Sequence, residues 1–224
     1  MDYIGEIAKT KLPFAPVKIP LSKRIFDIVA SLFFFVVFSP FILFVLLFYC
    51  LEYLFISQNR GSLFYTETRI SKAKPFKIYK FRIFKTKVGL DYAKIYGFVQ
   101  TKALEQNPNN LTLLGKILKQ IYMDELPQVY NVLKGDMTLV GPRPSNEVVT
   151  WEDGKNNKFQ RYLFVCGITG SFQSEKGSLH HKDQTQMDME YILFCKDNPG
   201  WKIILKDIKI LCYTILTVLR AKGI

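Results

Sequence analysis

The apolar run over residues 28–51 most constrains what this chain can fold into. It contains no charged residue and is rich in Phe, Leu and Val. As one straight helix it would be about 36 Å long, which is enough to cross the hydrocarbon core of a bilayer. It is too long for the apolar part of a signal peptide, and no small-residue cleavage site follows it. The sequence therefore predicts a membrane segment.

Ser39-Pro40, near the middle of the run, leaves two forms open for that segment. A helix broken at the proline gives two halves of about 18 Å, and neither could span. Because spanning helices also tolerate proline, a kinked span and a re-entrant hairpin both remain. Basic residues flank the run on both sides: Lys18, Lys23 and Arg24 before it, and Arg60 and Arg69 after it. The positive-inside rule places both ends on one face of the membrane, which favours the hairpin.

Two adjacent carboxylates, Asp124 and Glu125, open a second informative stretch. Asp124 is a good helix N-cap, and Pro127 would fall in the first helical turn. Apolar residues then recur at helical spacing, and Gly135 supplies a stop. At such a helix start, free N–H groups would favour a carboxylate or a bound phosphate. The same pattern is also ordinary helix punctuation, so the local sequence allows either meaning.

Arg143 lies between Pro142 and Pro144, shortly after the carboxylate pair. The two prolines restrict the backbone on either side of it. A guanidinium held on a stiff turn suits bidentate recognition of a phosphate group. A rigid corner without a ligand would use the same residues.

Residues 76–85 alternate apolar and basic side chains, which indicates a short strand or ribbon with one basic face. The alternation slips at Tyr79-Lys80, where a bulge or bend is expected. Lys80 and Arg82 lie on the basic side. Such a face is either solvated or a contact for anions and lipid headgroups.

The last segment, from Trp201 onward, has the pattern of an amphipathic helix. Lys202, Lys206 and Lys209 fall on one face, whereas the apolar residues assigned to the other are Ile203, Ile204, Ile208, Leu211 and Ile215. An apolar face, a lysine stripe and a tryptophan are typical of a helix lying on an anionic membrane surface. Packing against the core of the protein is the alternative.

The net charge of +12 predicts an anionic partner. Nucleic acid is not expected, because the apolar run argues against it and no recognition motif accompanies the charge. The four cysteines show no paired spacing, which predicts reduced thiols. His180 and His181 are expected in a solvated loop rather than at a metal, and residues 91–104 are expected to include a short helix.

Together these features resemble the bacterial sugar transferase family, the monotopic polyprenyl-phosphate phosphoglycosyl transferases. The resemblance covers residues 21 to about 216 and keeps the family's motif order. The motifs that carry it are Lys23-Arg24-Ile25-Phe26-Asp27, Ser39-Pro40, Phe76-Lys77-Ile78-Tyr79-Lys80-Phe81-Arg82, Asp124-Glu125-Leu126-Pro127-Gln128, Asn131-Val132-Leu133-Lys134-Gly135-Asp136, Val140-Gly141-Pro142-Arg143-Pro144 and Gly167-Ile168-Thr169-Gly170.

This resemblance implies an α+β fold that is mainly helical. An N-terminal segment over residues 1–20 would precede a re-entrant membrane helix hairpin over 21–60, broken at Ser39-Pro40. A small catalytic domain with short strands would occupy residues 61–198. An amphipathic membrane-surface helix would follow over 199–224.

The resemblance also implies an enzyme at the cytoplasmic face of the bacterial inner membrane. It would move a sugar 1-phosphate from a UDP-sugar to a polyprenyl phosphate and release UMP, in contact with anionic lipids. Asp124 would be the nucleophile that forms a phosphosugar-aspartyl intermediate, Glu125 would be its catalytic partner, and both would bind Mg²⁺. The residues expected to contact phosphate are Arg143, Lys80, Arg82 and Lys119.

Two departures from the family pattern keep a second reading open. Lys119 stands where the family usually has arginine, which keeps the charge and loses the bidentate fork. After Gly170 the chain continues Ser171-Phe172-Gln173-Ser174-Glu175-Lys176-Gly177, whereas the family commonly has Trp-x-Gln-Val-x-Gly-Arg. The alternative is therefore a catalytically inactive, membrane-bound scaffold of the same fold.

Overall fold

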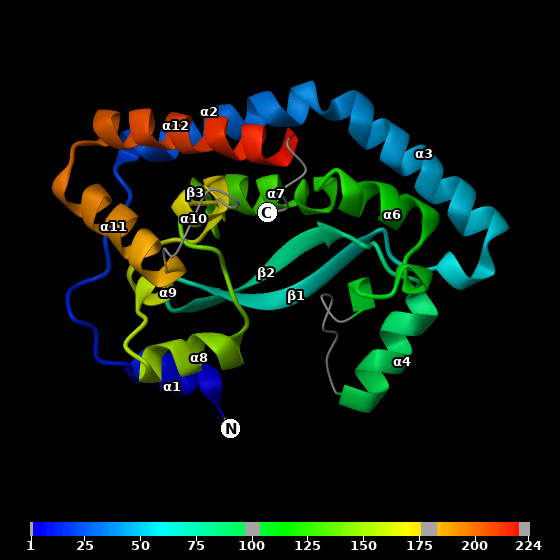
Figure 1. Ribbon diagram of the computed structural model, residues 1–224, viewed down its shortest axis with the longest axis horizontal. Helices are drawn as coiled ribbons and strands as arrows, with labels where there is room; N and C mark the ends of the chain where they lie inside the picture. Colours follow the sequence, from blue (N-terminus) through cyan, green and yellow to red (C-terminus); the bar gives the residue numbers. More distant parts are fainter. Residues whose placement is uncertain (1, 97–103, 176–182, 220–224) are drawn as a thin grey trace. The chain divides into compact units, whose positions relative to one another are not determined.

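Helices dominate the computed structural model, which describes residues 2–96, 104–175 and 183–219 and contains two small two-stranded sheets (Figure 1). The mainly helical α+β prediction is confirmed. Contacts divide the chain into two units that interleave in sequence. The first comprises Met1–Phe33, Thr66–Ile78 and Gln128–Ile224, and the second comprises Phe34–Tyr65 and Tyr79–Pro127.

The apolar run forms two helices, α2 (Leu21–Val37) and α3 (Ser39–Phe55), which meet at a bend of 56°. Pro40 lies in the first turn of α3, where its missing N–H removes no helical bond. The Ser39 hydroxyl donates to the carbonyl of Val36, 2.8 Å away, and so continues the bonding across the break. Among the described residues, no single helix is long and apolar enough to cross a membrane. By length and composition, this bent pair together could do so.

The first unit is built around strands β3 (Thr138–Val140) and β4 (Gly167–Thr169), which pair in parallel with Thr138 opposite Gly167. The helices of this unit that follow or precede α2 are α1 (Tyr3–Lys9), α7 (Gln128–Lys134), α8 (Glu147–Lys155), α9 (Gln160–Leu163), α10 (Ser171–Ser174), α11 (Gln184–Asp197) and α12 (Gly200–Leu219). Its main core gathers apolar side chains from the two strands, from Phe76 and Ile78, and from helices α2, α7, α9, α11 and α12. Gly135, with φ of 95°, ends α7 as the sequence predicts.

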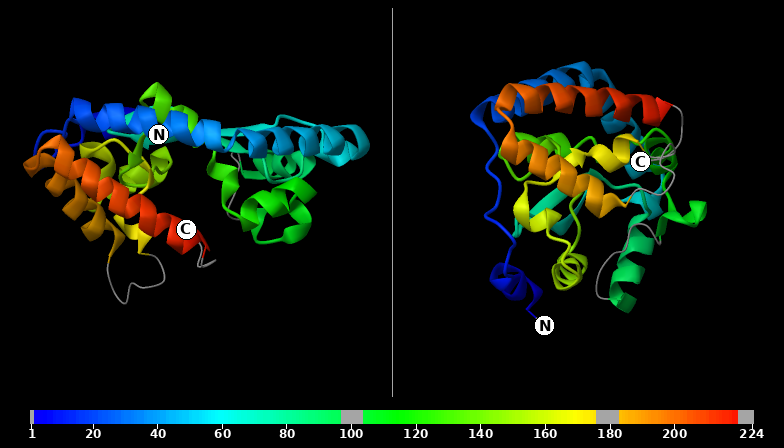
Figure 2. Two further views of the ribbon diagram at one scale, coloured as in Figure 1. Left: turned by 90° about the horizontal axis from the view of Figure 1, so that it is seen from above. Right: turned by 60° about the vertical axis from the view of Figure 1, so that its left-hand side comes forward.

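A fully buried polar network ties α2 to the rest of the first unit. The Lys23 ammonium lies 2.5 Å from an Asp207 carboxylate oxygen, and both side chains have no exposed surface. Tyr191 donates its hydroxyl to the other oxygen of Asp207 at 2.6 Å. Asp27, one turn along α2, accepts a bond of 2.5 Å from the Thr138 hydroxyl on β3. Helices α2 and α12 accordingly lie side by side (Figures 1 and 2).

Arg24 has a structural partner as well. Its guanidinium donates to the carbonyls of Val132 and Leu133, at 2.6 Å and 2.9 Å, and so binds the C-terminal end of α7. Arg60 and Arg69, after the membrane run, also have partners within the protein, Tyr53 and Glu67. The positive-inside rule depends on the side of the membrane on which basic residues lie, so the hairpin stays a prediction.

Helix α12 distributes its apolar residues over two opposite faces. Ile203 and Ile210 are buried in the first unit, whereas Trp201, Leu205 and Ile208 are 59%, 59% and 42% exposed. The prediction that Ile203 and Ile208 share one apolar face is therefore wrong, because five residues rotate them by about 140° around the helix. The helix packs on the core through one side and presents an apolar stripe on the other. Residues 220–224 of the predicted surface helix lie outside the described residues.

The hairpin of β1 (Phe64–Ser71) and β2 (Lys74–Phe81) turns at Lys72 and Ala73, which both have positive φ. Strand β2 confirms the strand predicted from the alternating pattern. Ile78 and Phe81 are 3% and 4% exposed, and the two residues between them are partly buried, which is where the alternation slips.

The second unit packs around a cluster that includes Val45 of α3, Phe81, Leu114 and Leu118. Its remaining elements are the helix α4 (Thr86–Tyr96), the 3₁₀ turns η1 (Ser57–Asn59), η2 (Pro108–Asn110) and η3 (Met123–Glu125), and the helix α6 (Leu113–Gln120). The helix predicted within residues 91–104 begins earlier, at Thr86, and residues 97–103 lie outside the described residues.

Glu52 connects α3 to α6 within the second unit. It is the first charged residue after the apolar run and is only 7% exposed. One of its carboxylate oxygens accepts a bond of 2.8 Å from the backbone N–H of Leu114. Thr112 caps the same helix by accepting from Gly115 at 2.8 Å. Both bonds satisfy N–H groups that a helix start leaves unpaired.

Some sequence expectations concern residues that the structure does not describe. His180 and His181, as well as Lys176 and Gly177 of the departing segment, lie outside the described residues. The expectation of unpaired thiols is confirmed: Cys50, Cys166, Cys195 and Cys212 are all free, and the second and third of these are buried.

Candidate active site

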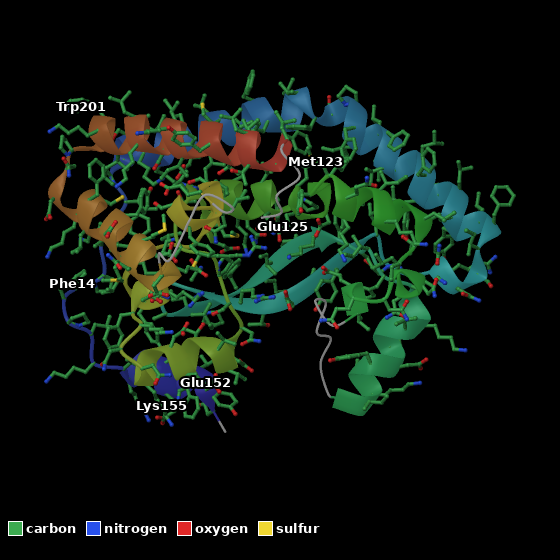
Figure 3. All side chains as sticks on the ribbon, in the orientation of Figure 1. Phe14, Met123, Glu125, Glu152, Lys155 and Trp201 are labelled. Carbon is green, nitrogen blue, oxygen red and sulfur yellow. The ribbon has the colours of Figure 1, made fainter. Side chains whose placement is uncertain are left out.

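The carboxylate pair lies in the 3₁₀ turn η3 of the second unit, which can be located by Met123 and Glu125 in Figure 3. Tyr122 enters this turn in the left-handed conformation, with φ of 57°. Helix α7 begins only at Gln128. The prediction that Asp124 caps the following helix is therefore wrong, because the reversal at Tyr122 starts a separate turn. Left-handed backbone at a residue with a side chain costs about 1–2 kcal/mol and is frequent at functional sites.

Asp124 is in an environment that disfavours its charged form. Burial raises the pKa of this carboxyl from 3.8 to about 6, and the neighbouring Glu125 carboxylate acts in the same direction. The Lys80 ammonium lowers this pKa, while the more distant Glu105 raises it. Lys80 is paired with Glu125 itself, through an Nζ to Oε1 distance of 2.8 Å. The charge of Lys80 thus acts on both carboxylates, while its ion pair is with Glu125.

This donor set fits Mg²⁺ in its usual mode of binding. Magnesium prefers hard oxygen ligands and is commonly held by one or two carboxylates, with water and substrate phosphates completing six positions. In the part of the chain that the structure describes, no group of three or more His, Cys, Asp or Glu side chains could hold a metal alone. Asp124 and Glu125 are two adjacent carboxylates with an excess of negative charge, which matches a site completed by phosphate oxygens.

The other basic residues predicted near the pair have partners inside the second unit. Lys119 donates to the backbone carbonyl of Glu105 at 2.8 Å, and its Nζ lies 3.8 Å from the Glu105 carboxylate. Arg82 donates to three backbone carbonyls, those of Ser62, Phe84 and Asn59, at 2.6, 2.6 and 2.8 Å. These bonds give Arg82 a structural role in joining β2 to η1. A phosphate contact by either residue stays a prediction.

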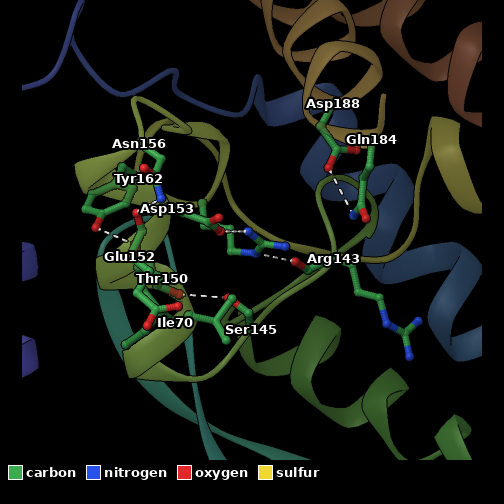
Figure 4. Close-up of polar contacts among 12 residues, drawn as sticks. Ile70, Arg143, Ser145, Thr150, Glu152, Asp153, Asn156, Tyr162, Gln184 and Asp188 are labelled. Atoms are coloured by element: carbon green, nitrogen blue, oxygen red, sulfur yellow. Dashed lines mark hydrogen bonds and ion pairs between the residues drawn. The ribbon is translucent and has the colours of Figure 1, made fainter. Parts of the chain in front are cut away.

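Arg143 belongs to the first unit, on the loop that follows β3. Its backbone carbonyl accepts a bond of 2.8 Å from Arg161 Nε. Figure 4 shows the Arg143 side chain extending away from Asp153 and Thr150. The structure thus groups Lys80, Asp124 and Glu125 in one unit and assigns Arg143 to the other.

Sequence reasoning missed two residues that shape these surroundings, Glu105 and Arg161. Glu105 influences the pKa of Asp124 and binds Lys119, yet it lies in a polar connection without a motif. Arg161 lies outside the motifs named in the sequence analysis. No local sequence pattern indicates either residue, because the partners of each lie several positions away in the sequence and are brought close by the fold.

The comparison with protein families identifies the chain. The model described as bacterial sugar transferase matches residues 19–221. The chain belongs to the bacterial sugar transferase family. Its relatives include the exopolysaccharide production protein PSS of Rhizobium leguminosarum bv. phaseoli. That protein is 40% identical over 210 residues, which cover 90% of this chain and 97% of the relative.

Two further relatives are longer proteins. The undecaprenyl-phosphate galactose phosphotransferase of Salmonella typhimurium is 31% identical over 214 residues, covering 90% of this chain and 41% of the relative. The galactosyl transferase CpsE of Streptococcus agalactiae is 33% identical over 177 residues, covering 75% of this chain and 37% of the relative. The chain therefore spans less than half the length of these two relatives and nearly the whole of the Rhizobium protein.

Proposed function

We propose that this chain is a polyprenyl-phosphate phosphoglycosyl transferase, which moves a sugar 1-phosphate from a UDP-sugar to a polyprenyl phosphate and releases UMP. The observation that carries the proposal is the partly buried Asp124-Glu125 pair, with the pKa of Asp124 raised to about 6. A perturbed carboxyl with a specific charged neighbour is a candidate catalytic group. Family membership and the name of the Salmonella relative, an undecaprenyl-phosphate galactose phosphotransferase, support a sugar phosphate transfer to a polyprenyl phosphate.

The proposed reaction has two steps on one phosphorus atom. The Asp124 carboxylate attacks the sugar-proximal phosphorus of the UDP-sugar, the bond from that phosphorus to the UMP oxygen breaks, and UMP leaves. An oxygen of the polyprenyl phosphate then attacks the same phosphorus, and the bond to Asp124 breaks. This covalent strategy gives ping-pong kinetics. Since Asp124 must be ionised to attack, a pKa near 6 leaves most of it reactive at neutral pH.

Other residues of the chain would hold charge in this reaction. Lys80 keeps Glu125 oriented beside the nucleophile through their ion pair. Asp124 and Glu125 would hold Mg²⁺, which when bound neutralises charge on the diphosphate oxygens. Arg143 and Lys119 are proposed to bind phosphate oxygens and to stabilise the charge that develops there.

We propose further that α2 and α3 form a re-entrant anchor in the cytoplasmic face of the inner membrane. Val17, before α2, accepts a bond of 3.1 Å from Lys72 Nζ, after α3. Val17 also packs in one core with Phe76 and Ile78. These contacts between a residue before α2 and residues after α3 support an anchor whose two flanking segments lie on the same side of a membrane. The boundaries of the anchor, residues 21–60, and of the surface helix, residues 199–224, remain predictions from the sequence.

The lipid-facing surface of this anchor is rich in exposed apolar side chains. A soluble monomer rarely exposes a contiguous apolar patch of more than a few hundred Å². The exposed apolar residues on α2 and α3 include Val29, Leu32, Phe33, Phe35, Val36, Leu43, Leu47, Leu54 and Phe55. Burying them in lipid would place the enzyme where a polyprenyl phosphate is available.

The decisive experiment measures UMP release from a panel of UDP-sugars by the full chain in nanodiscs containing polyprenyl phosphate. UMP should appear with at least one sugar, only when Mg²⁺ is present, and Asp124→Asn should abolish it. Asp91→Asn is the matched control, because that side chain is 54% exposed and its distance to the Lys94 ammonium is 3.9 Å. Full activity of Asp124→Asn would exclude the nucleophile assignment. A wild-type protein that yields neither UMP nor a covalent intermediate would favour the inactive scaffold.

A further inference from the structure

We propose that Arg161 is a positioning residue for Arg143, holding the backbone of the loop from which Arg143 reaches its phosphate. This inference rests on the proposed function for its catalytic consequence. Arg161 donates its Nε to the Arg143 carbonyl at 2.8 Å. Its Nη1 forms an ion pair with Asp153 on α8, and the two side chains are 11% and 16% exposed. One guanidinium thus joins the loop to a helix.

The loop is anchored on both sides of Arg143 as well. The Gly141 N–H donates to the Thr169 carbonyl at 2.9 Å, and the Pro142 carbonyl accepts from Gly167 at 2.9 Å. Beyond the arginine, the Ser145 carbonyl accepts a bond of 2.9 Å from Ile70 on β1. The bond from Arg161 is thus placed at the centre of a fixed segment.

The Ser145 side chain adds a second link to α8. Its hydroxyl lies 2.8 Å from that of Thr150, which also donates to the Asn146 carbonyl at 2.8 Å. Figure 4 shows the link between Ser145 and Thr150 together with the Arg143 side chain, which extends away from it. The backbone from which Arg143 extends is therefore held in place, which is what preorganised binding of a ligand requires.

A buried acid reinforces the position of Arg161. Asp188 on α11 is 1% exposed. Burial raises the pKa of Asp188 to about 6, and the charge of Arg161 opposes that rise. The guanidinium is thus paired with Asp153, interacts with the charge of Asp188 and donates to the loop. A lysine could keep the charge but has no planar fork with which to reach Asp153 and the Arg143 carbonyl together.

Arg161→Lys tests the proposal because it keeps a positive charge at this position and removes the Nε donor. The first measurement is backbone hydrogen exchange of the full chain in detergent. Peptides covering residues 141–146 should exchange faster than in the wild type, and peptides covering α12 should not change. Arg60→Lys is the matched control, since Arg60 Nε also donates to a backbone carbonyl, that of Tyr53 at 3.1 Å. It should leave residues 141–146 unchanged.

The second measurement is a double-mutant cycle on kcat/KM for UMP release. Arg161→Lys should lower kcat/KM by roughly 10- to 100-fold, as expected when a catalytic group is displaced by about an ångström. In an Arg143→Ala background the same substitution should change it by less than about twofold, because there is no side chain left to position. An equal loss in both backgrounds would show that Arg161 acts through the fold and not through Arg143.

The two measurements separate failure of this inference from failure of the proposed function. If hydrogen exchange over residues 141–146 is unchanged in Arg161→Lys, the proposed positioning role of Arg161 is rejected, whether or not the protein is active. If hydrogen exchange rises in this variant but the wild type releases no UMP from any UDP-sugar, Arg161 does position the loop and the proposed transferase activity is rejected.

Discussion

Asp124→Asn should stabilise the fold while removing the proposed nucleophile. Burial raises the pKa of this carboxyl from 3.8 to about 6, with the Glu125 carboxylate acting in the same direction. A group with a higher pKa in the folded chain binds its proton more tightly there than in the unfolded chain. Ionising Asp124 therefore costs folding free energy. Asparagine has nearly the same shape and cannot ionise, so it avoids this cost.

The size of the effect follows from the pKa. A rise from 3.8 to about 6 corresponds to about 3 kcal/mol once the carboxylate is fully ionised. The cost is absent at low pH, where both states are protonated, grows as the pH rises through the interval, and is constant above it. Near pH 5 it is about half of its final value. For a chain of this size, 3 kcal/mol is about 6–12 °C in Tm.

Thermal unfolding in detergent without Mg²⁺ measures this directly. Asp124→Asn should have a higher Tm than the wild type at about pH 7.5, and the difference should shrink by about half near pH 5. Asp91→Asn, at a side chain that is 54% exposed, should change Tm little at either pH. The reasoning is refuted if Asp124→Asn is no more stable than the wild type at the higher pH, or if its advantage does not depend on pH.

Two further predictions concern the anchor. Lys23→Met leaves the fully buried Asp27 and Asp207 without their cation, so it should destabilise the first unit by about 3–5 kcal/mol, and adding Asp207→Leu should restore part of the loss in the same unfolding assay. Single cysteines replacing Lys18 and Lys94, in a background without other exposed cysteines, should react with an impermeant reagent from the same side of sealed vesicles. Reaction from opposite sides would contradict the re-entrant anchor.

The parts of the fold that the sequence predicted correctly have local determinants. Gly135 ends α7 because a single residue that accepts positive φ is sufficient there. Residues 74–81 form β2, and the alternation of apolar and basic side chains that predicts this strand is visible within a few residues. Lys23 shows where such reasoning stops. Its charge was interpreted as a membrane flank, whereas its partner Asp207 lies 184 positions away in the chain. No pattern in a single sequence indicates that pairing.

The candidate site divides in the same way. Asp124 and Glu125 were found because they are adjacent, and Arg143 because two prolines enclose it. Their supports are distant: Lys80 lies 45 positions from Glu125, and Arg161 lies 18 positions from Arg143. The prediction of a helix cap at Asp124 failed for a local reason, because nothing in the sequence indicated a left-handed backbone at Tyr122.

That failed prediction changes the chemistry expected of Asp124. A helix cap would have stabilised the carboxylate with free N–H groups and the helix dipole, and would have lowered its pKa. In the 3₁₀ turn the balance of burial and neighbouring carboxylates raises the pKa instead, and Lys80, which lowers it, is paired with Glu125. The ionised pair then gains most from a ligand that brings positive charge. A divalent cation is such a ligand, which supports the proposal of a magnesium-assisted nucleophile at this turn.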